Sequence, residues 1–326
     1  MQARKLELVH FQLTRLCNLH CWFCGQWGEH GAFRESRGQA MTTDDWLAVI
    51  DSLAQGAQRD GAWPSVILWG GEPLLSESFE PVVKRLHALG APLGMVTNGT
   101  LIDRHAALCR EAFQQIYISV DGVPAVHDAI RGQGMFARVR DNLRLLRGGR
   151  AKITLMSVTT PELDRALPET LAAFEALQPD KVLLQARIGL QAGEVSAYQS
   201  WMRACFGQEA AGIAAWTVEE PLQPHPKAWY EAQLTQQPFP VQYLPHGREA
   251  ARPFCLSPYR HAHVGWDGRV GFCTDFVDFS LGNVHETPLP ELFASDLADR
   301  FAREVEAGHC ATCAHCSWLN SETFGL

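Results

Sequence analysis

Residues 13–25 read LTRLCNLHCWFCG, a stretch in which Cys17, Cys21 and Cys24 follow the spacing C-x3-C-x2-C. The preceding residues, 8–14, are apolar and β-rich, so we expect the three cysteines in a loop directly after a strand. Three thiolates on a short loop can each bind one iron of a [4Fe-4S] cubane and leave the fourth iron without a protein ligand. That open iron would be a place for a small molecule to bind.

Five more strand-like runs follow, and they alternate with amphipathic helical segments. The runs cover 65–71, 92–99, 115–122, 152–159 and 181–187. The helical segments cover 42–58, with Thr42 as the predicted cap, and 79–89, 103–113, 136–146 and 164–177. Such alternation predicts a parallel α/β sheet, and six units are too few to close an eight-stranded barrel. We therefore expect an open, partial (β/α)6 TIM-like barrel.

Each unusual motif of the sequence follows one of these predicted strands. The cysteine loop follows the first, residues 70–73 the second, Asn98 the third and Asp121 the fourth. Functional loops of parallel barrels gather at the carboxyl ends of the strands. The motifs are thus expected to meet at one mouth of the barrel.

Taken together, these motifs resemble the signature of the radical S-adenosylmethionine (SAM) superfamily. Residues 69–73, WGGEP, resemble the family's GGEP motif, and residues 118–122, ISVDG, resemble its ribose-contacting segment. The resemblance implies that the open iron chelates the amino and carboxylate groups of SAM. It also implies that one electron from the cluster yields a 5′-deoxyadenosyl radical, which removes a hydrogen atom from the substrate.

The same resemblance implies a set of SAM-binding residues. Phe23 would pack near the adenine, and Gly70, Gly71 and Glu72 would hold the ammonium group of SAM. Ser119 and Asp121 would form hydrogen bonds with the ribose. Arg131 would lie near the SAM carboxylate, and Asn98 would also belong to the SAM site. Several of them have a plainer alternative: a turn at the glycines or at Asn98, a helix cap at Ser119, and a surface side chain at Arg131.

A second cysteine group follows residue 250. Cys255 and Cys273 flank a predicted hairpin over 263–273, with Asp267-Gly268 as a two-residue turn. A predicted helix over 289–305 then leads to Cys310, Cys313 and Cys316. This order resembles the short C-terminal SPASM or twitch extension of radical SAM enzymes, which implies one auxiliary [4Fe-4S] cluster. The resemblance favours Cys255, Cys273, Cys313 and Cys316, the last shortly before Trp318, with Cys310 as a spare or alternate ligand.

Zinc is the alternative metal for both groups of cysteines. At the first group His20 or His30 could complete four ligands, although the spacing is not that of a usual zinc knuckle, and the second group could form a tetrathiolate. The clustering of the ten cysteines favours metal over disulfides in a reducing compartment.

Charge and hydropathy limit the expected location of the protein and its expected binding partners. The net charge of −8 disfavours nucleic acid. No apolar run is long enough to span a bilayer, and the N-terminus lacks a secretory signal, so no membrane is expected and the cytoplasm is the expected location. We expect three regions: a radical SAM core over 1–210, an irregular or helical connector over 211–252 that could line the cavity, and the auxiliary domain over 253–326.

The auxiliary cluster suggests a net oxidation, for which Asp275, two residues after Cys273, is the candidate catalytic base; a turn-capping role is the alternative. The resemblance favours oxidative modification of a peptide or protein side chain. A small-molecule dehydrogenase or epimerase acting on a sugar or cyclitol is the second hypothesis, because the cluster motif begins at residue 17 and leaves no room before it for a peptide-recognition domain. A non-catalytic iron-sulfur or zinc protein is the third. A flavodoxin- or ferredoxin-type protein is the expected electron donor.

Overall fold

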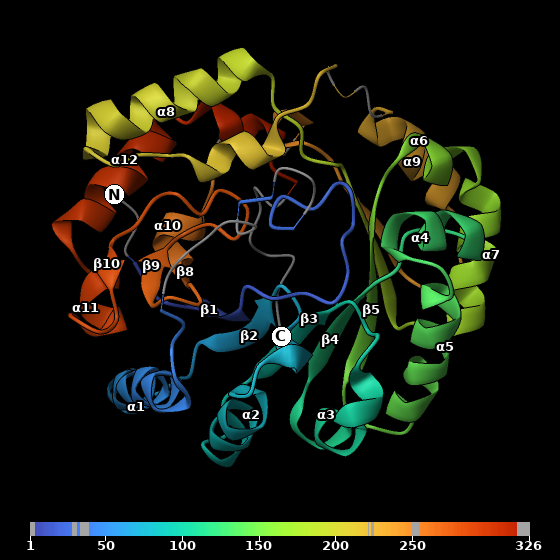
Figure 1. Ribbon diagram of the computed structural model, residues 1–326, viewed down its shortest axis with the longest axis horizontal. Helices are drawn as coiled ribbons and strands as arrows, with labels where there is room; N and C mark the ends of the chain where they lie inside the picture. Colours follow the sequence, from blue (N-terminus) through green and yellow to red (C-terminus); the bar gives the residue numbers. More distant parts are fainter. Residues whose placement is uncertain are drawn as a thin grey trace.

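The computed structural model describes residues 4–27, 31–32, 39–220, 222, 225–249 and 254–317, and Figure 1 shows the arrangement of its elements. All six predicted strands are present. They are β1 (Leu8–Thr14), β2 (Ser65–Gly70), β3 (Leu93–Thr97), β4 (Gln115–Ser119), β5 (Lys152–Val158) and β6 (Lys181–Gln185). Each pairs in parallel with the next, which confirms the open α/β barrel.

Helices cover the outer face of this sheet, as Figure 1 shows for α1, α2, α3 and α5. They are α1 (Thr43–Asp60), α2 (Phe79–Ala88), α3 (Ala106–Ala112), α4 (Pro124–Arg131), α5 (Met135–Leu146), α6 (Pro161–Arg165) and α7 (Leu167–Leu177). The predicted cap at Thr42 is confirmed: its side chain accepts from the Asp45 backbone N–H and Asp45 reciprocates, an arrangement that stabilises a helix by about 1 kcal/mol. Trp46 of α1 then packs on Phe11 of β1, and both are fully buried.

The sheet is wider than the six predicted strands. A seventh parallel strand, β7 (Val241–Leu244), pairs with β6, and β8 (His261–Val264) pairs in parallel with β1 at the opposite edge. The strand order is β10-β9-β8-β1-β2-β3-β4-β5-β6-β7. The C-terminal cysteine region is thus attached to the strand that precedes the first cysteine loop. The division of the chain at 210 and 252 stays a prediction.

Two details of the C-terminal prediction are wrong. The hairpin of β8 and β9 (Arg269–Gly271) turns through three residues rather than two: Gly265 N donates to Arg269 O, and Gly268 adopts a left-handed φ of 81°. A short strand β10 (Gly282–Asn283) follows. The predicted helix over 289–305 is two helices, α11 (Leu289–Phe293) and α12 (Asp296–Glu306), because the Ser295 side chain caps Ala298 N and starts a new helix.

Besides β7, the described residues of 189–249 include the helices α8 (Ala192–Phe206) and α9 (Lys227–Leu234). They also include two 3-10 turns, η3 (Gly212–Trp216) and η4 (Gly247–Glu249). Helix α8 lies beside α12, where Trp201 contacts Phe301 with ring centroids 5.9 Å apart (Figure 1). Among the described residues, none of the helices combines the length and apolar character needed to cross a bilayer.

Candidate active site

The Gly70-Gly71 pair fixes the end of β2 against the cysteine loop. Gly71 N donates to Thr14 O at 2.8 Å, and Glu72 N donates to Leu16 O at 2.7 Å. A Cβ atom on Gly71 would lie 2.1 Å from Leu16 O, and one on Gly70 would lie 2.4 Å from Thr14 O. Only residues without a side chain allow this approach of two backbones, so the glycines determine where the cysteine loop sits.

A cavity of about 250 Å³, partly open to solvent, occupies the carboxyl ends of the strands. Cys17, Cys21 and Cys24 all line it, as expected of residues in one loop after β1. Six of the eight predicted SAM-binding residues share the same wall: Phe23, Gly70, Gly71, Asn98, Ser119 and Arg131. The expectation that motifs from separate strands meet at one mouth is therefore confirmed.

The surroundings of the three thiols suit metal-bound thiolates. Leu19 N points at Cys17 Sγ from 3.4 Å, and Trp27 N points at Cys24 Sγ from the same distance. Burial raises the pKa of the Cys17 thiol to about 12 and also raises that of Cys21. Thiolates in such a place need a cation to hold them, and a cluster of iron ions supplies one. The loop thus fits a [4Fe-4S] cluster.

Glu72 lies behind the cavity wall rather than in it. Its side chain is fully buried and accepts from Thr97 Oγ1 at 2.7 Å, from Asn98 N at 2.8 Å and from Leu74 N at 3.2 Å. Burial raises its pKa to about 7 even though these donors oppose the shift. In this arrangement the carboxylate joins β2 to the end of β3, and a direct contact of Glu72 with SAM stays a prediction.

Asp121 is likewise buried, and it positions Arg131. Arg131 Nε donates to Asp121 Oδ2 at 2.6 Å, and Val158 N donates to Asp121 Oδ1 at 3.0 Å. Burial alone would lower the pKa of Arg131, but the Asp121 carboxylate raises it above its usual value. Arg131 is therefore a paired cation in the cavity wall, and contacts of either residue with SAM stay predictions.

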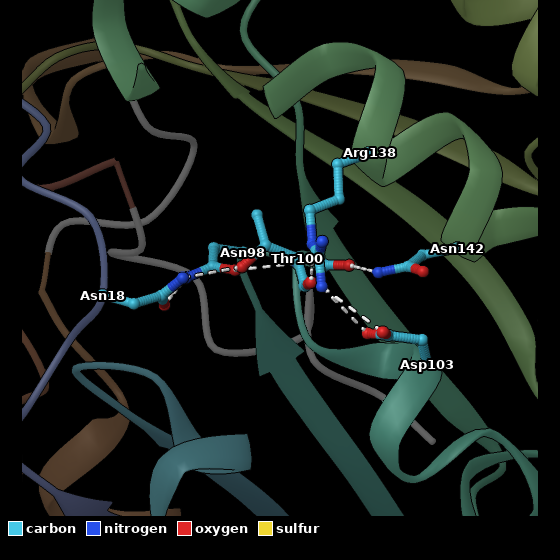
Figure 2. Close-up of polar contacts among 7 residues, drawn as sticks. Asn18, Asn98, Thr100, Asp103, Arg138 and Asn142 are labelled. Atoms are coloured by element: carbon cyan, nitrogen blue, oxygen red, sulfur yellow. Dashed lines mark hydrogen bonds and ion pairs between the residues drawn. The ribbon is translucent and has the colours of Figure 1, made fainter. Parts of the chain in front are cut away.

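Asn98 connects the turn after β3 to the cysteine loop (Figure 2). Its Nδ2 donates to Asn18 Oδ1 at 2.9 Å, and Asn18 Nδ2 donates in turn to Thr100 Oγ1 at 2.9 Å. The same Asn98 amide nitrogen lies 3.9 Å from Cys17 Sγ. The amide side chain thereby orients the loop that carries the first cysteine, a contact that spans 80 residues of sequence and that the local pattern did not predict.

Helix α5 fixes that turn from the other side. Arg138 Nε donates to Thr100 O at 2.6 Å and Asn142 Nδ2 donates to Gly99 O at 2.8 Å, while Arg138 also pairs with Asp103 at 3.3 Å (Figure 2). The carbonyl groups of Gly99 and Thr100 are thus both hydrogen-bonded to α5, which restricts the conformation of the turn after β3.

A second cavity, of about 70 Å³, is lined by all five C-terminal cysteines. They are Cys255, Cys273, Cys310, Cys313 and Cys316. Ser257 N points at Cys255 Sγ from 3.4 Å, and Phe276 N points at Cys273 Sγ from 3.2 Å, as at the first group. Burial raises the pKa of both Cys255 and Cys273. The group fits an auxiliary cluster with one thiol more than four irons require.

We predict that Cys313 ligates this cluster and that Cys310, whose Sγ lies 3.2 Å from that of Cys313, is the spare thiol. The aromatic residue that favoured this choice, Trp318, lies outside the described residues. After anaerobic reconstitution, Cys313→Ala should lose about half of the roughly eight irons per chain, whereas the matched variant Cys310→Ala should keep them. The reverse pattern in iron analysis would make Cys310 the ligand.

Asp275 lies between the two cavities and lines both, together with Thr274 and His10. Its Oδ2 is buried and has no hydrogen-bond partner in the described part of the chain. Removal from solvent raises its pKa to about 7. Asp278, by contrast, accepts from Gly212 N at 2.6 Å and lines neither cavity.

Trp216 is a residue of this site that the sequence did not reveal. It lines the first cavity, its Nε1 donates to Asp275 O at 3.1 Å, and a Cβ atom on Gly25 would lie 2.4 Å from its ring. It therefore holds the Asp275 loop against the residue that follows Cys24. The only signal was its place in the segment without clear periodicity, where we expected residues that line the cavity.

An open parallel barrel with thiols gathered in two adjoining cavities fits an iron-sulfur enzyme. The family model of the radical SAM superfamily matches residues 11–174, and that of an iron-sulfur cluster-binding domain, SPASM, matches residues 255–317. The chain therefore belongs to the radical SAM superfamily and ends in a SPASM-type domain. This membership confirms a SAM-binding [4Fe-4S] cluster, an auxiliary cluster and SAM as cofactors, and it rules out the non-catalytic and zinc alternatives.

Individual proteins resemble the chain over nearly its whole length. Fe-coproporphyrin III synthase of Methanosarcina barkeri is 26% identical, covering 97% of this chain and 82% of the relative. Pre-heme d1 synthase of Dinoroseobacter shibae is also 26% identical, and the match covers 94% of this chain and 79% of the relative. Among solved structures, Streptococcus suis SuiB shares the fold at a TM-score of 0.65 and 13% identity, covering 96% of this chain and 72% of SuiB. Native anSMEcpe with bound AdoMet has a TM-score of 0.64 and 18% identity, and the match covers 96% of this chain and 89% of anSMEcpe.

Proposed function

We propose that the protein catalyses a net oxidation of its substrate in the first cavity, with Asp275 as the base and the auxiliary site as the electron acceptor. One observation carries this proposal: Asp275 lines the cavity of the first three cysteines and also the cavity of the five C-terminal cysteines. A carboxylate in that position can reach a substrate and also lie beside the auxiliary cluster.

The clusters and SAM, when bound, supply a 5′-deoxyadenosyl radical and an acceptor for one electron. A substrate C–H bond in the first cavity would give up its hydrogen atom to that radical. Asp275 would take a proton from the neighbouring substrate atom, and a cluster held by the C-terminal cysteines would accept the remaining electron. The substrate thus loses two hydrogen atoms and gains a double bond or a new link. We expect a flavodoxin- or ferredoxin-type protein to supply the electron for the first step.

Two substrate classes are compatible with this chemistry. The SPASM-type domain supports the oxidative modification of a peptide or protein side chain, as the sequence predicts. The relatives that cover nearly the whole chain are named as synthases of tetrapyrroles, which supports a small molecule. The predicted sugar or cyclitol is one member of the second class.

Replacing Asp275 by Asn should separate hydrogen abstraction from oxidation. We expect Asp275→Asn to form 5′-deoxyadenosine within about threefold of wild type but to lose at least about 100-fold of the dehydrogenated product, because a positioned base contributes 10²–10⁴-fold. Mass spectrometry of a metabolite and peptide mixture, incubated with SAM and dithionite, would detect loss of two hydrogen atoms.

Asp278→Asn is the matched control, since Asp278 lines neither cavity and should leave the ratio of product to 5′-deoxyadenosine unchanged. An Asp275→Asn enzyme with an unchanged ratio would exclude the proposed role of Asp275.

A further inference from the structure

Two polar side chains at the end of β6 line the first cavity and have no role in the site described so far. They are Gln185, the last residue of β6, and Arg187, two positions further along. The cavity also contains Arg131, which the resemblance assigns to SAM and which Asp121 neutralises. Arg187 is therefore a second cation in the same cavity.

Arg187 is held by an aromatic ring of the cysteine loop. Its guanidinium carbon lies 4.5 Å from the centroid of Trp22, the residue after Cys21. A guanidinium over the face of an indole is attracted by the ring without using its N–H donors. The contact fixes the direction of the side chain without using any of its donors.

Arg187 has no counter-charge among the residues that the structure describes. Its Nε is buried without a hydrogen-bond partner there, and no acidic side chain in these ranges forms an ion pair with it. Burial lowers the pKa of the guanidinium, the direction expected of a desolvated cation without compensation. Gln185 Oε1, in the same wall, is also buried without a partner. Buried polar groups in proteins are normally satisfied, so these two call for a bound group.

We infer that Arg187, with Gln185 beside it, binds a carboxylate of the substrate. A guanidinium presents parallel N–H donors that match a carboxylate. Gln185 Oε1 is an acceptor, so it would bond an N–H or O–H group elsewhere on the same substrate. This binding role rests on the proposed oxidation. Arg187 would anchor the carboxylate end of the substrate while another part of the substrate approaches Asp275 in the same cavity. The substrate class is then an organic acid or a peptide with an acidic group.

Ligand binding without turnover tests this inference. The reconstituted holoenzyme, saturated with SAM, is dialysed to equilibrium against radiolabelled hexanoate, with hexanamide as the uncharged match. We expect hexanoate to bind at least about tenfold more tightly than hexanamide, and Arg187→Gln to remove this difference, because charge-assisted bonds are about twice as strong as neutral ones. Arg187→Lys should restore part of it, since the charge stays but the planar fork is lost.

Affinity for SAM decides between the substrate and SAM itself as the partner of Arg187. We expect Arg187→Gln to bind SAM within about twofold of wild type, because Arg131 remains. A SAM affinity weakened tenfold or more, or equal binding of hexanoate to wild type and Arg187→Gln, would overturn the inference. Failure of the oxidation proposal would show instead as an Asp275→Asn enzyme with unchanged product, and it would leave these binding results intact.

Discussion

Alanine at Cys17, Cys21 or Cys24 is expected to lower the formation of 5′-deoxyadenosine by at least about 100-fold, because each thiol would hold one iron of the SAM-binding cluster. All three line the same cavity, and backbone N–H groups point at two of the sulfurs. The measurement is chromatographic quantification of 5′-deoxyadenosine after anaerobic reconstitution with iron and sulfide, followed by SAM and dithionite.

The auxiliary thiols provide the control for this result. Cys255→Ala should keep more of the SAM cleavage than any variant of the first group, since Cys255 lies in the second cavity. Iron analysis of each variant shows which cluster was lost. If a variant of the first group kept both its iron and its 5′-deoxyadenosine yield, the assignment of that cysteine would be wrong.

Gly71→Ala is expected to have the second large effect. Its Cβ atom would lie 2.1 Å from Leu16 O, a backbone atom that moves only if the cysteine loop moves. Overpacking of this kind costs about 2 kcal/mol or more of the free energy of unfolding. We expect a lower melting temperature and at least about a tenfold loss of 5′-deoxyadenosine, because the loop that carries the cluster is displaced.

Gly56→Ala is the matched control for that variant. Gly56 lies within α1, and the nearest atom to an added Cβ is the end of the Arg59 side chain, at 3.9 Å. Alanine should stabilise this helix by about 0.5–1 kcal/mol and leave SAM cleavage unchanged. If Gly71→Ala behaved like Gly56→Ala, the backbone contact between β2 and the cysteine loop would not be essential.

The parts of the fold that the sequence predicted are those with local signals. The six core strands are five to seven residues long, and amphipathic helices separate most of them. The periodicity of hydrophobic residues was therefore sufficient to predict these strands. Strands β7 and β8 have four residues each and are stabilised by pairing with β6 and β1, partners far away in the chain. Short segments of this kind carry too little pattern to show their place in the sheet.

The features of the candidate site also fall into local ones, which could be predicted, and long-range ones, which could not. Cysteine spacing predicted that Cys17, Cys21 and Cys24 gather, because spacing within a loop is a local property. The gathering of the five C-terminal cysteines was predicted from the family resemblance instead, since they are spread over 255–316. Sequence did not show that Glu72 turns away from the cavity, since its direction depends on Thr97 and Asn98, 25 and 26 residues later. It also did not show that Trp216 joins the two cysteine loops or that Arg187 stacks on Trp22. Contacts between distant segments decided these features.

The central claim is that this chain cleaves SAM at the cluster of the first cysteine loop. The most direct test is the reconstituted wild-type enzyme with SAM and dithionite under strict exclusion of oxygen. We predict that 5′-deoxyadenosine accumulates in step with methionine and requires both the reductant and the first three cysteines. Intact clusters, verified by iron content and spectroscopy, with no 5′-deoxyadenosine under these conditions would contradict the account.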